Sequence, residues 1–355
     1  MLTFFSDPHL GKTLKANTTV ESRARLSEQL FLHAKAVESL AQGDYIICGG
    51  DLFDTEHNEE AVILQGAEVA SFCKTVIGGN HDVANVAHHV SSLKVLERLQ
   101  EERRFVLPPE PGSVRADTFT FEDLVLLAVV PHHARQEEFE QALDKAHRAA
   151  QSAPGHLRKL LLVHCNYNLK FESGQNDLNL TDAKARQMLT SFDYIIMGHD
   201  HRPRTECDGR LIVLGNTHPT CFGDLGEKFV WKYSPQENTF HRHLLCPDGS
   251  RTVEAAELLE AWNAGRLTAE FSAVEWLDVV GCAPAEQMAD LSKALRAVWK
   301  AAPDLYAARM TRVEFLGTGQ GEARAAESPK TLIETVREGM PAQLRPLFDQ
   351  LIAEV

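Results

Sequence analysis

Residues 45–54 read Tyr-Ile-Ile-Cys-Gly-Gly-Asp-Leu-Phe-Asp, an apolar run of strand length that ends in two glycines and an aspartate. The same arrangement, a short apolar run followed closely by Asp, Asn or His, occurs four more times. The other runs are 2–5, 75–77, 160–163 and 194–197, followed by Asp7-Pro8-His9, Gly79-Asn80-His81-Asp82, His164 and Gly198-His199-Asp200-His201. Segments of helical periodicity separate most of these runs. This alternation predicts β-α-β units and a sheet with parallel strands.

The five polar sequences all follow the carboxyl end of an expected strand. Taken singly, each has an ordinary explanation, since Gly-Asn is a common turn and two histidines two residues apart occur in surface loops. In an open α/β sheet, however, the carboxyl ends of the strands meet at one crevice. Five such sequences in succession therefore predict a single site.

The side chains of these sequences form a coherent set of metal ligands. They offer carboxylate and amide oxygens and imidazole nitrogens without a thiolate, which suits Mn²⁺, Fe²⁺ or Zn²⁺. The seven candidates are Asp7, His9, Asp51, Asn80, His164, His199 and His201. Seven ligands exceed the needs of one ion, whereas two ions that share a carboxylate would use them all. Such a pair can hold both the attacking and the leaving oxygen of a phosphoryl displacement.

The order D-x-H, G-D, G-N-H, H and G-H-x-H resembles the calcineurin-like metallophosphoesterase superfamily over roughly residues 1–220. The resemblance implies an α/β sandwich of two mixed sheets flanked by helices. It also implies that Asp7, His9 and His201 hold one divalent metal, that Asn80, His164 and His199 hold a second, and that Asp51 bridges them. By the same resemblance, His81 protonates the leaving oxygen and Asp54 is the acidic residue that orients His81.

The sequence is more similar to one branch of this superfamily than to another. Phosphoprotein phosphatases carry an arginine just after the second aspartate, but here Thr55 and Glu56 follow Asp54. Residues 6–11, 50–55, 79–82 and 198–203 instead resemble the SbcD nuclease subunit and its recombination relatives, although Pro8, His218 and Asp224 depart from that pattern. The resemblance implies a Mn²⁺-dependent DNA exonuclease, with endonuclease activity as a second mode, in DNA repair, recombination or processing. It further implies an SbcC-like coiled-coil ATPase partner and a homodimer.

Two alternatives remain open at this point. One is a stand-alone phosphatase or cyclic-nucleotide phosphodiesterase on the same fold, and the other is a binding scaffold that has kept the fold. The formal net charge of −14 excludes a nucleic-acid binder whose whole surface is basic. Candidate contacts to a phosphate backbone are therefore local, and we expect them at Lys12, Arg202 and Arg204, although scattered charges usually belong to a solvated surface.

The chain is expected to contain three parts. Residues 1–245 form the metallophosphoesterase domain, residues 250–318 a small α+β capping domain, and residues 329–355 a helical tail. In the capping domain the pattern predicts helices at 253–264 and 285–300 and strands at 270–280 and 310–316. The tail has an apolar stripe that either packs on its own domain or docks on the ATPase.

Compartment follows from what the sequence lacks. The longest apolar runs are of strand length, far below the roughly 20 residues of a membrane span. No secretory signal precedes the first strand, and the seven cysteines are scattered singly, which fits reduced thiols. We therefore expect a cytoplasmic protein that does not engage a membrane.

Overall fold

The computed structural model describes residues 1–83, 90–100, 103–169 and 178–316. The first of its two large sheets has the strand order β14-β13-β1-β2-β3-β4. Its strands are β1 (Leu2–Phe5), β2 (Tyr45–Cys48), β3 (Cys73–Ile77), β4 (Arg104–Val106), β13 (Lys228–Ser234) and β14 (Thr239–Cys246). Strands β1 to β4 are parallel, whereas β13 and β14 are antiparallel additions at the edge.

The second large sheet has the order β11-β12-β10-β7-β6-β5. Its strands are β5 (Asp117–Phe121), β6 (Val125–Val130), β7 (Arg158–His164), β10 (Tyr194–Gly198), β11 (Arg204–Glu206) and β12 (Leu211–Val213). The four central strands are parallel, and β5 and β11 close the edges in antiparallel pairing. A further pair, β8 (Asn166–Tyr167) with β9 (Asn179–Leu180), stands apart from both sheets.

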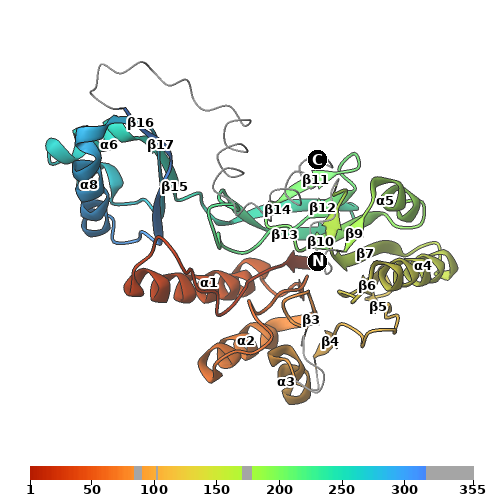
Figure 1. Ribbon diagram of the computed structural model, residues 1–355. Coiled ribbons are helices and arrows are strands. Elements are labelled where there is room, and N and C mark those ends of the chain that lie inside the picture. The colour runs from red at the N-terminus through yellow and green to blue at the C-terminus, as the bar shows by residue number, and fades with distance from the viewer. Residues whose placement is uncertain (84–89, 101–102, 170–177, 317–355) are drawn as a thin grey trace, which may run out of the picture.

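Apolar side chains hold the two sheets together as a sandwich. Phe4 and Ile47 of the first sheet share one buried cluster with Leu127 and Leu162 of the second. Helices α1 (Val20–Ala41), α2 (Glu60–Phe72) and α3 (Ser92–Leu99) cover the outer face of the first sheet, and α4 (Gln136–Ser152) and α5 (Asp182–Met188) that of the second (Figure 1). This arrangement confirms the predicted α/β sandwich of two mixed sheets flanked by helices.

The C-terminal unit begins at Ser250. It contains β15 (Ser250–Glu254), α6 (Ala255–Asn263), α7 (Leu267–Phe271), β16 (Trp276–Pro284), the 3₁₀ turn η1 (Ala285–Gln287), α8 (Met288–Ala301) and β17 (Ala307–Leu316). The three strands are parallel in the order β15-β16-β17, and the helices connect them (Figure 1).

The structure of this unit differs from the sequence-based prediction at two places. The predicted strand at 270–280 begins only at Trp276, because Leu267, Phe271 and Val274 recur at helical spacing and pack into the core of the unit. Strand β15 was not predicted, since Ser250, Arg251 and Thr252 give it no apolar signal.

The C-terminal unit packs against α1. Leu26 and Leu30 of the helix share a buried cluster with Trp276 and Tyr306 of the unit. The guanidinium of Arg25 also donates a hydrogen bond to the Leu305 carbonyl at 3.0 Å. The predicted helical tail, residues 329–355, and the end of the predicted capping domain, 317–318, lie outside the described residues.

Within the described ranges, no helix combines the length and the apolar character needed to cross a membrane. All seven cysteines lie in those ranges, and none of them forms a disulfide.

Candidate metal centre

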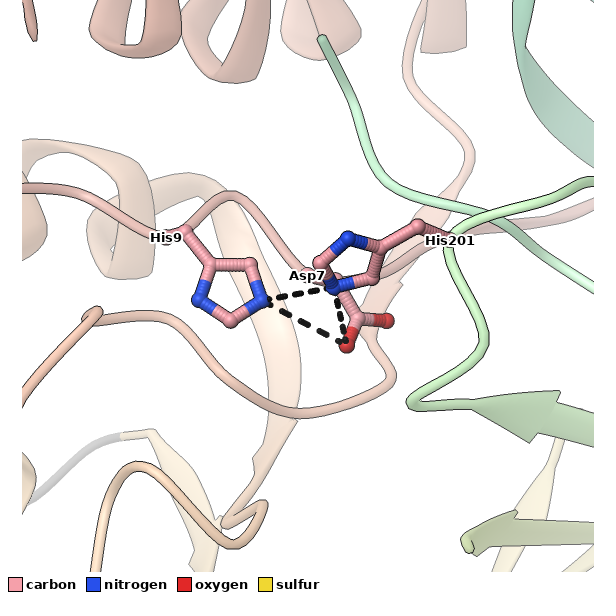
Figure 2. A group of neighbouring side chains, drawn as sticks. All are labelled: Asp7, His9 and His201. Carbon is pink, nitrogen blue, oxygen red and sulfur yellow. Dashed lines mark hydrogen bonds and ion pairs between the residues drawn. The ribbon is translucent and has the colours of Figure 1, made fainter. Parts of the chain in front are cut away.

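The carboxyl ends of strands from both sheets bring the first group of candidate ligands together. Asp7 and His9 follow β1 of the first sheet, and His201 follows β10 of the second. The Nε2 atoms of His9 and His201 face each other at 2.9 Å (Figure 2). The carboxylate of Asp7 lies 3.9 Å from the first of these nitrogens and 4.0 Å from the second. Three donors thus converge on one point.

The second group lies beside the first. His164 is the last residue of β7 and presents Nε2 to the amide oxygen of Asn80 at 3.1 Å, and His199 presents Nδ1 to the same oxygen at 2.8 Å. Asp51, at the end of β2, places a carboxylate oxygen 3.3 Å from His164 Nε2. Asp51, His164 and His199 form a second set of converging donors.

Asp51 stands between the two groups. The same carboxylate oxygen that meets His164 lies 3.8 Å from His9 Nε2 of the first group. The structure therefore brings together all seven predicted ligands, with Asp51 at the position that a bridging ligand would take. Its other oxygen accepts a hydrogen bond from the backbone N–H of His81 at 2.9 Å.

These residues fit divalent metal ions. Asp7, His9, Asp51 and His164 are almost fully excluded from solvent, and buried carboxylates persist where they are paired or coordinate a metal. The Nε2 atoms of His9 and His201 face each other at 2.9 Å, with the Asp7 carboxylate 3.9 and 4.0 Å from them, an arrangement that a shared cation would explain. The mixture of oxygen and nitrogen donors suits Mn²⁺, Fe²⁺ or Zn²⁺.

Four of the seven candidate ligands have a strained backbone. Asp7, His9, Asp51 and His199 all have positive φ angles, of 54°, 48°, 47° and 89°. Such conformations cost a residue other than glycine of the order of 1–3 kcal/mol and persist only where the surrounding structure imposes them. Here the strained turns direct each side chain into the site as its strand ends.

Glycine is required where the loops cross closest to the ligands. A Cβ at Gly79 would lie 2.1 Å from a carboxylate oxygen of Asp51, and a Cβ at Gly50 would lie 2.2 Å from His164 Nδ1. Gly50 also has a φ of +119°, which side chains rarely permit. The glycines of the G-D and G-N-H sequences therefore serve the packing of the ligands.

The second ring nitrogen of three ligand histidines meets an oxygen. His164 Nδ1 lies 3.0 Å from the Gly49 carbonyl, and His9 Nδ1 lies 3.2 Å from the Asp54 carboxylate. His201 Nδ1 lies 2.8 Å from the Asp224 carboxylate. Contacts of this kind fix the ring orientation and raise the basicity of the nitrogen that faces the metal.

His81 is held by Asp54, but through a different atom from the one expected. Its Nδ1 lies 2.6 Å from the backbone carbonyl oxygen of Asp54. The carboxylate of Asp54 instead accepts a hydrogen bond from Lys12 Nζ at 2.9 Å and faces His9. The expectation that the acidic group orients His81 is therefore corrected: the carboxylate is engaged by Lys12 and His9, and the backbone carbonyl of Asp54 contacts the His81 ring instead.

The three basic residues predicted to contact substrate differ in whether they already form ion pairs within the protein. Lys12 is paired with Asp54, and the Arg204 guanidinium is paired with Asp200 at 2.6 Å and Glu206 at 2.9 Å. Arg202 is exposed beside His201, and its guanidinium makes no hydrogen bond or ion pair with the part of the chain that the structure describes.

Two residues near the site had no role assigned from sequence. The buried carboxylate of Asp82 accepts backbone hydrogen bonds from Leu52, Phe53 and Gly79, and it thereby ties the loop of Asp51 to the loop of Asn80. The sequence shows that Asp82 follows Gly79-Asn80-His81, but it does not show that the side chain points inward. His132 follows β6, where burial and the charge of His164 lower its pKa to about 3.

Burial and neighbouring charges shift the pKa values of the ligand histidines in opposite directions. Burial alone raises the pKa of Asp51, but the charges of His164 and His9 outweigh it and hold that pKa well below its usual range. Burial lowers the pKa of His164, yet Asp51 raises it to about 9, whereas burial and the charge of His164 lower the pKa of His199 to about 4. Since a metal-binding imidazole must be neutral, we expect metal uptake to release a proton from His164.

Comparison with known proteins agrees with this geometry. The family model for the calcineurin-like phosphoesterases matches residues 1–203, more than half of the chain. The chain belongs to this family and is a metal-dependent phosphoester hydrolase. Among solved structures, the phosphopantetheinyl hydrolase PptH from Mycobacterium tuberculosis is similar at 14% identity, with 61% of this chain and 89% of that chain covered and a TM-score of 0.37. Similarity at this level says nothing about substrate.

Metal binding is expected to stabilise the fold. Saturation with Mn²⁺ at about 100 times its dissociation constant adds about 2.7 kcal/mol, because the unfolded chain does not assemble the ligands. For a domain of this size that corresponds to a rise in Tm of about 5–10 °C. Thermal unfolding of the EDTA-treated protein with and without Mn²⁺ measures the rise. A rise of equal size in Asp7→Asn would contradict a site that includes this carboxylate.

Proposed function

We propose that this protein is a two-metal, Mn²⁺-dependent DNA phosphodiesterase, with exonuclease activity as its main mode and endonuclease activity as a second mode, in DNA repair, recombination or processing. The observation that carries the proposal is the position of Asp51 between two complete ligand groups, with His81 beside them. The resemblance of the five motifs to the SbcD branch supports DNA as the substrate. The missing arginine after Asp54 argues against the phosphoprotein phosphatases.

The ligand groups define what each residue does. Asp7, His9 and His201 would hold one metal, Asn80, His164 and His199 would hold the other, and Asp51, which lies within reach of both groups, would serve both. Bound Mn²⁺ ions at these groups would neutralise charge on the phosphoryl oxygens and so lower the barrier to displacement. Asp54 and Asp224 keep the rings of His9 and His201 oriented through their outer nitrogens.

His81 supplies the proton for the leaving oxygen. In its doubly protonated form, Nδ1–H donates to the Asp54 carbonyl at 2.6 Å, which fixes the ring and leaves the Nε2 proton available. Its backbone N–H is anchored on Asp51, so the ring is tied to the residue between the two ligand groups. A positioned general acid of this kind contributes about 10²–10⁴-fold to the rate.

The substrate assignment is tested with the purified chain and two substrates. End-labelled linear duplex DNA and a small bis-aryl phosphodiester are incubated with Mn²⁺ side by side. Degradation of the DNA supports the nuclease, and the label gives the polarity. Cleavage of the small ester alone, with no gain when an SbcC-like ATPase is added, would favour a phosphatase or a cyclic-nucleotide phosphodiesterase. Cleavage of neither would favour a binding scaffold.

Arg202→Ala is expected to weaken DNA binding. Its exposed guanidinium is available to a phosphate beside His201, and loss of one exposed charge contact costs about 1 kcal/mol, or about fivefold in KM. The slope of log KM against log salt concentration should also fall by about one. Arg204→Ala should have a smaller effect, because that guanidinium is already paired. Arg148→Ala, exposed on α4, is the control, and an effect of equal size there would reject the contact.

Partners and compartment complete the proposal. We place the protein in the cytoplasm, which the seven cysteines without disulfides support. We also propose a homodimer and association with an SbcC-like coiled-coil ATPase through residues 329–355. Light scattering measures the dimer. Copurification of the ATPase with the full chain, and its loss on deletion of residues after Ser328, tests the association, whereas unchanged copurification would reject that surface.

A further inference from the structure

The connection between β12 and β13 lies between the metal centre and the C-terminal unit. On its inner side, Asp224 faces the metal ligand His201. On its outer side, Phe222 contacts the C-terminal unit. Only one residue separates the two, so the position of one ring constrains the position of the other side chain.

Asp224 is held by the connection itself. Besides facing His201 Nδ1, the carboxylate accepts hydrogen bonds from Asn216 Nδ2 at 2.8 Å, from the Thr220 hydroxyl at 2.7 Å and from the Cys221 backbone at 2.9 Å. The carboxylate is buried. Since two of these donors belong to residues 220–221, a displacement of this backbone would move the carboxylate away from His201.

Lys228 joins the same connection to the ligand loop. Its fully buried ammonium donates a hydrogen bond to the His201 carbonyl at 3.0 Å and another to the Asp224 carbonyl. The backbone of the metal ligand and the backbone of its carboxylate partner are therefore held by one cation. This ammonium links the two backbones, whereas the side-chain contact between Asp224 and His201 depends on the donors at residues 216, 220 and 221.

Phe222 is held from the other side by two residues of the C-terminal unit. The Trp276 ring meets it edge-on, with centroids 5.3 Å apart, and the Arg309 guanidinium lies 4.1 Å from its centroid. Arg309 is itself fixed by two hydrogen bonds to the Asp278 carboxylate, at 3.1 and 2.7 Å. Aromatic and cation–π contacts of this kind hold the Phe222 ring in place from the C-terminal side.

We propose that Phe222 is a positioning residue through which the C-terminal unit holds Asp224 behind His201, so that affinity for the metal of the first ligand group depends on this contact. The inference rests on the proposed function only in requiring that His201 bind a divalent metal. It does not depend on the substrate.

The test is calorimetric titration of the full, EDTA-treated chain with Mn²⁺. The variants are Phe222→Ala, Phe222→Tyr, Asp224→Asn and the double variant Phe222→Ala/Asp224→Asn. Phe119→Ala is the matched control. Phe119 is also half-buried, with the Arg104 guanidinium 4.9 Å from its ring, but it lies on β5 at the edge of the second large sheet. Arg309→Gln removes the cation from the C-terminal side and leaves the connection unchanged, so it serves if Phe222→Ala does not fold.

Asp224→Asn is expected to weaken one of two Mn²⁺ binding events by about 10–100-fold, as for loss of a carboxylate behind a ligand histidine. Phe222→Ala should weaken the same event by about tenfold, and Arg309→Gln by about threefold. Phe222→Tyr and Phe119→Ala should leave both events within about twofold of the original. The double variant should bind no more weakly than Asp224→Asn, because Phe222 acts through Asp224.

Three results would overturn the inference. The first is unchanged Mn²⁺ affinity, in Phe222→Ala and Arg309→Gln, at the binding event that Asp224→Asn weakens. The second is an equal loss of affinity in both binding events. The third is a loss of affinity in the double variant equal to the product of the two single losses. Unchanged Mn²⁺ binding in a Phe222→Ala protein that still degrades DNA would reject this inference and leave the proposed function intact. Two Mn²⁺ binding events with the expected dependence on Phe222, in a protein that cuts no DNA, would support this inference and reject DNA as the substrate.

Discussion

Asp51→Asn is expected to lower both metal retention and the rate of hydrolysis sharply. The carboxylate lies 3.8 Å from His9 and 3.3 Å from His164, so its loss removes a negative charge from both ligand groups at once. Metal ions contribute several kcal/mol of charge stabilisation to a phosphoryl transfer. At about 1.4 kcal/mol for each factor of ten, the rate should fall by at least about 10³-fold.

Metal content and rate are measured on the same preparations. Elemental analysis should give about two Mn²⁺ per wild-type chain and fewer than one in Asp51→Asn. Asp117→Asn is the matched control and should retain both metal and rate. Asp117 lies on the edge strand β5, and its carboxylate is paired with Arg115. Full metal content in Asp51→Asn would show that the carboxylate does not bridge.

His81→Asn is expected to lower kcat by about 10²–10⁴-fold without loss of metal. The ring lies next to the ligands, but its Nδ1 is engaged by the Asp54 carbonyl, and no other interaction holds its Nε2 within the described part of the chain. Asparagine keeps the backbone N–H that Asp51 accepts, so the metal groups should stay intact.

Leaving-group dependence separates proton donation from a structural effect. An ester whose leaving group is a good one, such as a nitrophenol, needs little protonation and should lose much less rate in His81→Asn than an alkyl ester loses. A general structural defect would slow both esters equally. His156→Asn, an exposed histidine before β7, is the control. Loss of Mn²⁺ from His81→Asn would instead make His81 a ligand, since its ring also lies within reach of His9 and Asp51.

Much of the fold was predictable because its signals are local. Strands β2, β7 and β10 are short apolar runs of the kind that parallel sheets bury on both faces. Strand β15 escaped prediction because its polar residues give no such signal. There, pairing with β16 decides the conformation of the chain.

The seven candidate ligands were predictable for a related reason. Strand polarity and order place the residue after each parallel strand at the same edge, so D-x-H, G-D, G-N-H, H and G-H-x-H identify themselves by position and by donor chemistry. The structure adds that Asp51 lies between the groups and that four ligands have strained backbones.

The direction and partner of each side chain was decided only by the tertiary structure. The sequence resemblance predicted that the Asp54 carboxylate orients His81, yet that carboxylate contacts Lys12 and His9, and only the Asp54 backbone carbonyl contacts His81. Asp224 lies 23 residues after His201 and still faces it, because the connection that carries it folds back against the site. Local pattern determines which elements form and where donors emerge, whereas contacts between distant segments depend on how those elements pack, and no single stretch of sequence encodes that.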